Sequence, residues 1–240
     1  MLAHRGADLD PELCSPSRPP PAETEVAELA ALAASHDLDR ALAFIERLCR
    51  EGMSIERILI DLVTPAARLL GAQWKADLRG FTDVSAGLGT LQQLVHILGP
   101  SFAPQLPHRG LVVLTSAPGE QHTLGLQLVG EFLRREGYGV HVVAAMPEPD
   151  LIELVATEHV DLLGVTVSNT ALLKPLAGVV AAARRSSLNR GLDVMVGGSL
   201  ELDQFAANHG TLVYNRDVKS ALGRLARENR SVPSAKSKAG

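Results

Sequence analysis

The sequence predicts an α/β protein in which an N-terminal four-helix cap precedes a doubly wound, five-stranded parallel sheet of the flavodoxin-like type. Residues 24–98 repeat their apolar positions with the period of a helix. Beyond residue 110, short β-branched runs alternate with amphipathic helical stretches, which is typical of a parallel sheet covered by helices. The proline-bearing residues 99–109 separate the two patterns and predict a linker.

The N-terminal part begins with a proline-rich arm and two helices. Residues 1–22 end in several prolines, which block helix and ladder hydrogen bonds, so we expect them to be disordered. The next stretch carries leucine, isoleucine and valine near the 3.6-residue period. Thr24 and Asp39 are the N-caps that this pattern predicts, and Gly52 is the predicted stop.

Two further helices complete the predicted cap. The third begins at Ser54 and is expected to bend near Pro65, because proline removes a backbone donor. The fourth covers residues 81–98 and is predicted to end at Gly99 and Pro100.

The C-terminal part reads as five strands separated by helices within residues 110–229, followed by a flexible tail at 230–240. Continuous apolar character in each strand predicts burial on both faces. The predicted strands are 110–115, 138–145, 160–167, 192–198 and 211–215, and the predicted helices are 122–136, 148–158, 172–185, 200–209 and 216–229.

Composition narrows the function classes. The formal charge is −4, with 23 Lys+Arg against 27 Asp+Glu, so we expect no strong direct binding to nucleic acid. Cys14 and Cys49 have neither metal-ligand spacing nor a disulfide framework, which fits a reducing compartment. No apolar run reaches membrane-spanning length and no signal-peptide pattern opens the chain, so a cytoplasmic location without membrane partners is expected. Aromatic residues make up only 3%, which singles out Trp74 as a possible ligand platform.

Polar and glycine residues gather where three of the predicted strands end. In an open parallel sheet, ligands bind at the carboxyl ends of the strands. Taken singly, a loop histidine is more often a surface residue, serine and threonine often cap helices, and a glycine pair often makes a turn. Their coincidence at one sheet edge favours a site, and no phosphate-binding glycine motif competes with it. The residues are Glu120, His122 and Gly125 after the first strand, Ser168 and Thr170 after the third, and Gly197, Gly198 and Ser199 after the fourth.

The order Glu-x-His-x-x-Gly, Ser-x-Thr and Gly-Gly resembles the signature of cobalamin-binding domains, Asp-x-His-x-x-Gly, Ser-x-[Leu/Thr] and Gly-Gly. The separations agree with that family: residues 126–167 and 171–196 lie between the three elements, which are 42 and 26 residues. The chain departs from the signature at Glu120, where the family has aspartate.

The resemblance implies that cobalamin binds base-off and His-on, in its adenosyl, hydroxo or methyl form. His122 would be the lower axial ligand to cobalt, and Glu120 would accept a hydrogen bond from the N–H of the second ring nitrogen. The glycines would make room for the displaced nucleotide tail. The residues implied in cofactor binding are Trp74, Phe81, Val84, Thr115, Ser116, Glu120, Gln121, His122, Thr123, Leu124, Gly125, Ser168, Thr170, Leu172, Gly197, Gly198 and Ser199.

The cap resembles that of the AerR/PpaA group of purple-bacterial antirepressors, which has the pattern Trp-x-x-Asp-x-x-x-Phe-x-x-Val. Trp74, Asp77, Phe81 and Val84 stand at that spacing. The resemblance covers about residues 24–228 and implies a light-responsive regulator without enzymatic turnover, whose partner is a photosynthesis-gene repressor of the CrtJ/PpsR type. Core packing remains the ordinary alternative for Trp74.

Two other functions remain open at this point. One is a corrinoid carrier subunit of a methyltransferase system, which shares the cap, the sheet and the three motifs. The other is a haem-binding redox sensor, since an imidazole ligates iron as well as cobalt.

Overall fold

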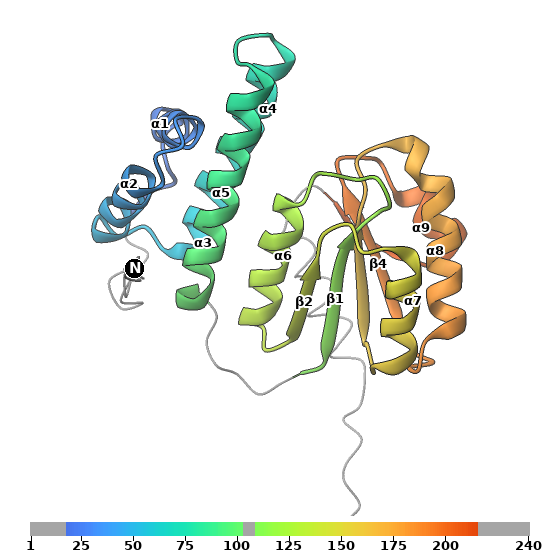
Figure 1. Ribbon diagram of the computed structural model, residues 1–240. Helices are drawn as coiled ribbons and strands as arrows, with labels where there is room; N and C mark the ends of the chain where they lie inside the picture. Colours follow the sequence, from blue (N-terminus) through green and yellow to red (C-terminus); the bar gives the residue numbers. More distant parts are fainter. Residues whose placement is uncertain (1–17, 103–108, 216–240) are drawn as a thin grey trace, which may run out of the picture. The chain divides into compact units, whose positions relative to one another are not determined.

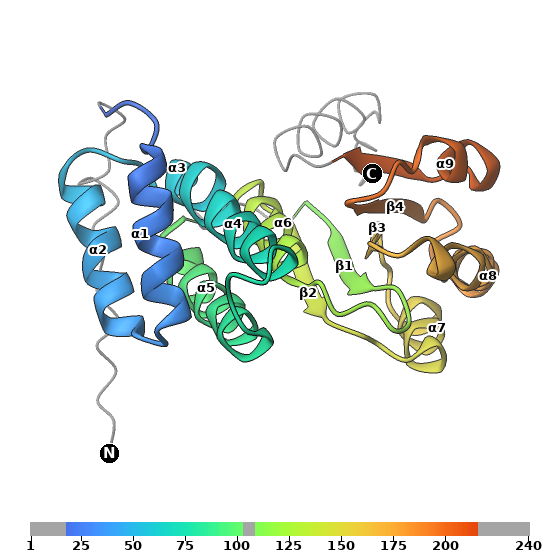
Figure 2. The same ribbon diagram turned by 90° about the horizontal axis from the view of Figure 1, so that it is seen from above.

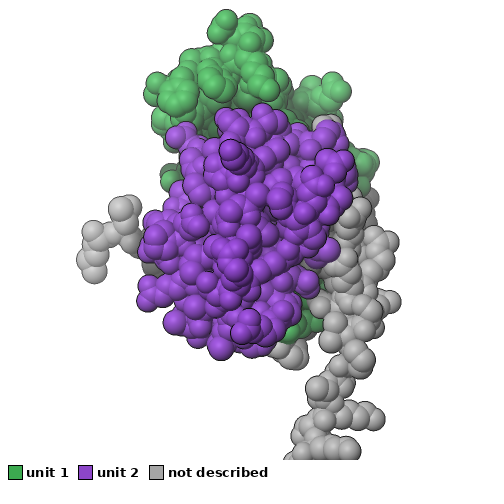
Figure 3. Space-filling view, turned by 90° about the vertical axis from the view of Figure 1, so that its right-hand side faces the viewer, with its two compact units in different colours: residues 1–109, 124–138 green, residues 110–123, 139–240 purple. Residues whose placement is uncertain are grey.

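A computed structural model describes residues 18–102 and 109–215 of the chain (Figure 1). Contacts between residues divide the chain into two compact units, coloured separately in Figure 3. Unit 1 comprises residues 1–109 and 124–138, and unit 2 comprises residues 110–123 and 139–240. The predicted fold class is confirmed, because a helical N-terminal part precedes a five-stranded parallel sheet. Most of the predicted arm and linker, the predicted helix 216–229 and the predicted tail lie outside the described residues.

Unit 1 is built from helices that share an apolar core. Leu29, Ile45 and Leu91 have no exposed surface, and α5 contacts α1, α4 and α6. The helix α6 follows the first strand in the chain, yet its contacts group it with the N-terminal helices. The elements are α1 (Glu23–Ala34), α2 (Leu38–Arg50), α3 (Ile55–Arg57), the π-helix η2 (Ile58–Val63), α4 (Thr64–Lys75), α5 (Phe81–Phe102) and α6 (Leu124–Arg135).

The first two helices each begin two residues earlier than their predicted caps require. The N-cap of α1 is Ala22, whose backbone N–H donates to the Glu25 carboxylate at 2.9 Å, so Thr24 lies inside the helix. The N-cap of α2 is Asp37 rather than Asp39. Its carboxylate accepts from the backbone N–H of Arg40 at 3.0 Å, which satisfies one of the free donors of the first turn.

The predicted third helix is divided into α3, the π-helix η2 and α4, and Pro65 lies in the first turn of α4, directly after η2. The bend near Pro65 stays a prediction. The predicted end of the fourth helix at residue 98 is wrong, because α5 continues to Phe102. Pro100 lies in the last turn of α5, where its missing N–H leaves only one helix carbonyl without its backbone hydrogen bond. Gly99 serves packing, because a Cβ there would overlap the Glu131 carboxylate of α6.

Unit 2 contains the sheet, whose strands are all parallel and follow the order β2-β1-β3-β4-β5. The chain reverses its direction of winding between β1 and β3, so the edge above these two strands is the topological switch point. The strands are β1 (Leu111–Ser116), β2 (Gly139–Val143), β3 (Leu162–Thr166), β4 (Asp193–Gly198) and β5 (Leu212–Asn215). The helical elements are α7 (Glu148–Thr157), the 3₁₀-helix η3 (Thr170–Leu172), α8 (Leu173–Ser186) and α9 (Asp203–His209).

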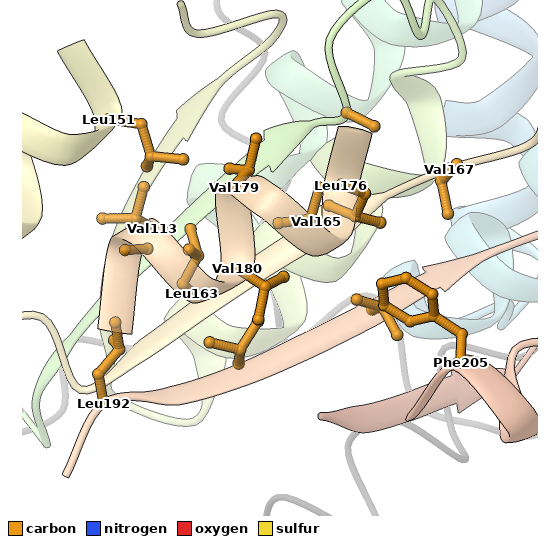
Figure 4. Close-up of a cluster of buried hydrophobic side chains, with 14 of the residues drawn as sticks. Val113, Leu151, Leu163, Val165, Val167, Leu176, Val179, Val180, Leu192 and Phe205 are labelled. Atoms are coloured by element: carbon orange, nitrogen blue, oxygen red, sulfur yellow. The ribbon is translucent and has the colours of Figure 1, made fainter. Parts of the chain in front are cut away.

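The core of unit 2 lies between one face of the sheet and the helices α7, α8 and α9. Figure 2 shows α7 and α8 side by side, and the two helices contact each other. In Figure 4, valines of the central strands such as Val165 meet Val179 and Val180 of α8 and Phe205 of α9. All five residues of β3 are buried, which is the pattern of a parallel strand covered on both faces. Within residues 18–102 and 109–215, no helix is long and apolar enough to span a membrane.

Candidate functional site

The polar residues predicted after β1 and β3 meet at the carboxyl edge of the sheet. The two strands are paired, with Ser116 opposite Thr166, so the loops that follow them start side by side. The backbone N–H of Ala117 donates to the Thr166 carbonyl at 2.9 Å and continues the ladder past the end of β1. This places the His122 loop, residues 117–123, within reach of Ser168.

Glu120 is the centre of the site. Its side chain is only 3% exposed, and both carboxylate oxygens accept hydrogen bonds. Oε1 accepts from the backbone N–H groups of Gln121 and His122, each at 2.9 Å, and lies 2.5 Å from Nδ1 of His122. Oε2 accepts from both the N–H and the hydroxyl of Ser168 at 2.5 Å. The longer side chain of glutamate therefore reaches the imidazole.

These donors keep Glu120 ionised. Burial alone raises the pKa of the carboxyl group, but hydrogen bonds from Ser168 and His122 outweigh it and lower the pKa to about 2. An ionised carboxylate can only accept, so the proton between the two side chains belongs to Nδ1 of His122. Ser168 Oγ donates a hydrogen bond to Oε2 of Glu120. It lies 2.9 Å from Nδ1 of His122 and accepts a hydrogen bond from the ring N–H.

The consequence is an imidazole with a defined free nitrogen. With Nδ1 protonated, Nε2 carries the lone pair, which is the form of histidine that ligates metals. The His122 side chain is 74% exposed, so Nε2 is accessible. His122 offers a single nitrogen ligand, so the other ligands of the metal would have to come from a macrocycle. The donor set therefore fits an axial ligand to the metal of a corrin or haem.

The glycines of the predicted motifs have different surroundings. Gly125 lies in the first turn of α6, and no described heavy atom lies within 4 Å of where its Cβ would stand. Gly198, in contrast, has φ +142°, and a Cβ there would overlap the carbonyl oxygen of Val167. The backbone conformation and the Val167 carbonyl require glycine at position 198. At position 125 no described atom requires glycine, so a bound ligand would be the reason for it.

The remaining predicted residues of unit 2 divide into exposed and buried groups. Thr115 and Ser116 are buried. The Thr115 hydroxyl accepts from the backbone N–H of Met146, and the Ser116 hydroxyl accepts from that of Ala145. Leu172 is partly buried and packs against the core of the unit. Gly197 is buried, and Gly198 is partly buried. Thr123 and Ser168 are also partly exposed, while Gln121, Thr170 and Ser199 are exposed. Leu124, the first residue of α6 in unit 1, is partly exposed as well.

The three predicted cap residues belong to unit 1. Trp74 and Phe81 are 47% and 68% exposed and form an edge-to-face pair with ring centroids 6.2 Å apart. Val84 is buried in the structure, so its side chain is not displayed with the two rings. Leu78 lies between the rings in sequence and is 75% exposed. Leu78 was not among the predicted residues, although it is the only large apolar residue in the stretch KADLRG.

Comparison with known proteins agrees with this chemistry. Residues 110–216 match the family model described as the B12 binding domain. The fold and the site thus define an α/β protein with a cobalamin-binding domain. The chain is 34% identical over 150 residues to an uncharacterized 20.5 kDa protein from the bchF-crtJ intergenic region of Rhodobacter capsulatus, covering 61% of this chain and 77% of that protein. It belongs to the same protein family as this Rhodobacter protein.

More distant similarity connects the chain with corrinoid proteins. It is 25% identical over 116 residues to dimethylamine corrinoid protein 3 of Methanosarcina acetivorans, which is 48% of this chain. The match spans 54% of that relative, about half its length. The structure of the monomethylamine corrinoid protein of Methanosarcina barkeri has the same fold, with a TM-score of 0.70 at 15% identity, covering 86% of this chain and all of that one.

Proposed function

We propose that this protein is a cobalamin-dependent, light-responsive antirepressor that binds cobalamin base-off with His122 as the lower axial ligand. The observation that carries the cofactor half of this proposal is the arrangement of Glu120, His122 and Ser168. It fixes the proton on Nδ1 and leaves Nε2 exposed at the switch point of the sheet. Haem would accept the same imidazole, but the B12-binding family match favours the corrin.

In this proposal the protein binds and orients, without catalysing a reaction. His122 would provide the axial nitrogen, and Glu120 holds the orientation of the ring. The open space at Gly125 admits the displaced nucleotide. Bound cobalamin would supply a cobalt–ligand bond that light can break. The assignment of Trp74 and Phe81 to the cofactor stays a prediction.

The regulatory half rests on two supports. One is the cap pattern shared with the AerR/PpaA antirepressors, and the other is the Rhodobacter relative, which is encoded between bchF and crtJ. We infer that the partner is a photosynthesis repressor of the CrtJ/PpsR type. Light would shift the protein between states only to the extent that the repressor binds one state more tightly than the other.

The test compares the full chain with His122→Ala. Wild type is expected to bind adenosylcobalamin in the dark with a histidine-ligated spectrum that changes irreversibly on illumination. His122→Ala is expected to lose the axial histidine signature completely. Repressor pull-downs in the dark and after illumination then test the regulatory half. Equal repressor binding in both states would contradict light-dependent antirepression even if the cofactor binds as proposed.

A corrinoid carrier of a methyltransferase system is the second candidate, favoured by the similarity to the dimethylamine corrinoid proteins. A carrier passes methyl groups through the reduced, nucleophilic state of cobalt, so it needs a reductive-activation partner. Transfer of methyl from the bound methylcobalamin to a thiol by an added methyltransferase, with no response to light, would establish the carrier and overturn the antirepressor. If the chain binds no corrinoid, haem titration is the experiment that follows.

A further inference from the structure

We propose that Ser116 is a positioning residue for His122, because its buried hydroxyl fastens the His122 loop to the β2–α7 loop, residues 144–147. The inference rests on the proposed cobalamin function and adds a residue that acts on the cobalt ligand from the interior of unit 2. Ser116 is the last residue of β1 and is 1% exposed.

The hydroxyl of Ser116 makes two hydrogen bonds that fix its own orientation. It lies 2.9 Å from the backbone nitrogen of Ala145 and 3.2 Å from the carbonyl oxygen of Glu120. The Ala145 N–H can only donate, so Ser116 Oγ accepts there. Its single proton is then free to point at the Glu120 carbonyl, which can only accept. One buried side chain thus joins the backbones of two loops.

The β2–α7 loop is a suitable anchor because it is held in one conformation. Ala145 has φ +53°, a left-handed conformation that non-glycine residues adopt only where their surroundings impose it. The next backbone N–H, that of Met146, lies 3.3 Å from Thr115 Oγ1, and Met146 packs against the core of unit 2. The two neighbouring hydroxyls at the end of β1 therefore hold consecutive residues of this loop.

The anchor matters because of the length of the Glu120 side chain. Glutamate has one more rotatable bond than the aspartate of the cobalamin signature, so its carboxylate can occupy more positions from a given backbone. Here both backbone groups of Glu120 are fixed: its N–H donates to the Ala117 carbonyl at 2.9 Å, and its carbonyl accepts from Ser116. Fixing the backbone limits where the carboxylate can lie and hence how the His122 ring is oriented.

The experiment uses the full chain labelled with ¹⁵N-histidine and loaded with cob(II)alamin. Electron paramagnetic resonance resolves whether the axial nitrogen is labelled, which gives the ratio of histidine-ligated to unligated cobalt. Ser116→Ala is expected to lower this ratio about tenfold, the effect of releasing the Glu120 carbonyl from its buried hydrogen bond. Ser187→Ala is the matched control, because Ser187 is also buried and its hydroxyl has no partner among the described residues. It should keep the wild-type ratio.

Each outcome decides the inference. A Ser116→Ala ratio equal to that of wild type and Ser187→Ala overturns it while leaving the cobalamin function intact. If Ser116→Ala does not fold, Ser116→Cys preserves the shape with a much weaker hydrogen-bonding group, and a wild-type ratio in that variant also overturns the inference. If the wild-type protein shows no labelled axial nitrogen, the proposed His122 ligation fails, and the role of Ser116 falls with it.

Discussion

The two regions of this protein with candidate ligand-facing side chains differ in how their atoms are held. In unit 2, Glu120 is buried and its carboxylate accepts from several donors, so His122 has one favoured orientation. In unit 1, three apolar side chains around the turn between α4 and α5 are exposed, namely Trp74, Leu78 and Phe81, and the two rings contact each other. The first region holds the imidazole in one orientation, whereas the exposed side chains of the second can change their contacts.

This difference is what the proposed function requires, namely one ligand that stays bound and one that changes. A preorganised ligand contributes the same interaction in every state of the protein. An exposed apolar group gains or loses contact area between states, and only such a difference in interaction can shift a population. Substitutions in the two regions should therefore separate effects on folding and cofactor retention from effects on the response.

The largest expected effect is structural and distinguishes two glycines of the site. Gly198→Ala combines φ +142° with overlap against the Val167 carbonyl, so we expect a loss of about 3 kcal/mol or more in the free energy of unfolding. Gly125→Ala should change that free energy by about 1 kcal/mol or less, and in the stabilising direction, because alanine favours a helix. Chemical denaturation of the cofactor-free chain measures both.

The same pair sharpens the cofactor assignment. Gly125→Ala fills space that no described atom occupies, so it should leave folding intact and weaken cobalamin binding. Unchanged cobalamin affinity in this variant would mean that the nucleotide tail does not pass Gly125. A Gly198→Ala protein of wild-type stability would contradict the close approach of the ends of β3 and β4.

The next effect concerns Glu120. Because its folded pKa is about 2, below the ordinary 4.5, the carboxylate stabilises the fold above pH 4.5 and loses this contribution as the pH falls toward 2. The shift corresponds to about 3 kcal/mol. Wild type should therefore lose about that much more stability than Glu120→Gln between pH 5 and 2, as measured by urea unfolding at each pH.

Glu120→Gln also tests the ligand geometry at neutral pH. The amide has one acceptor oxygen, so the Ser168 donors and the His122 proton cannot all be satisfied. We expect cobalamin affinity to fall about 10- to 100-fold, the usual consequence of removing a carboxylate behind a metal-ligating histidine. Parallel acid-unfolding curves for the two proteins, together with equal affinity, would show that Glu120 is not the group that holds His122.

The sequence was sufficient for the features that depend on pattern and chemistry. Strand and helix alternation predicted the sheet, and the resemblance to the cobalamin signature predicted that Glu120 would contact His122. The contact of Ser168 with both residues was not predicted, because the resemblance assigned Ser168 to the cofactor. The sequence was insufficient for features that depend on contacts between residues far apart in the chain. Gly99 looked like a helix stop, yet it makes room for Glu131 of a helix that comes later in the chain. Likewise, only the three-dimensional structure reveals that the carbonyl of Val167, directly after β3, requires glycine at 198 or that Val84 is buried.

The smallest expected effect lies in the exposed aromatic pair. Trp74→Ala removes a half-exposed ring whose edge-to-face contact contributes about 1 kcal/mol, so stability should change by about that amount or less. If the turn serves the response, illumination should alter the cobalamin spectrum or the repressor affinity differently in this variant, while axial ligation by His122 stays as in wild type.

Phe81→Ala is the matched control for this prediction, because it removes the other ring of the same contact. In a double-mutant cycle, the coupling free energy of the two rings in the unfolding reaction should be about 1 kcal/mol or less. A coupling that appears only in repressor binding after illumination would mean that the pair acts as a unit in the response. Loss of several kcal/mol of stability in either single variant would instead mean that the rings hold unit 1 together, and the contrast between a fixed and an adjustable region would then be wrong.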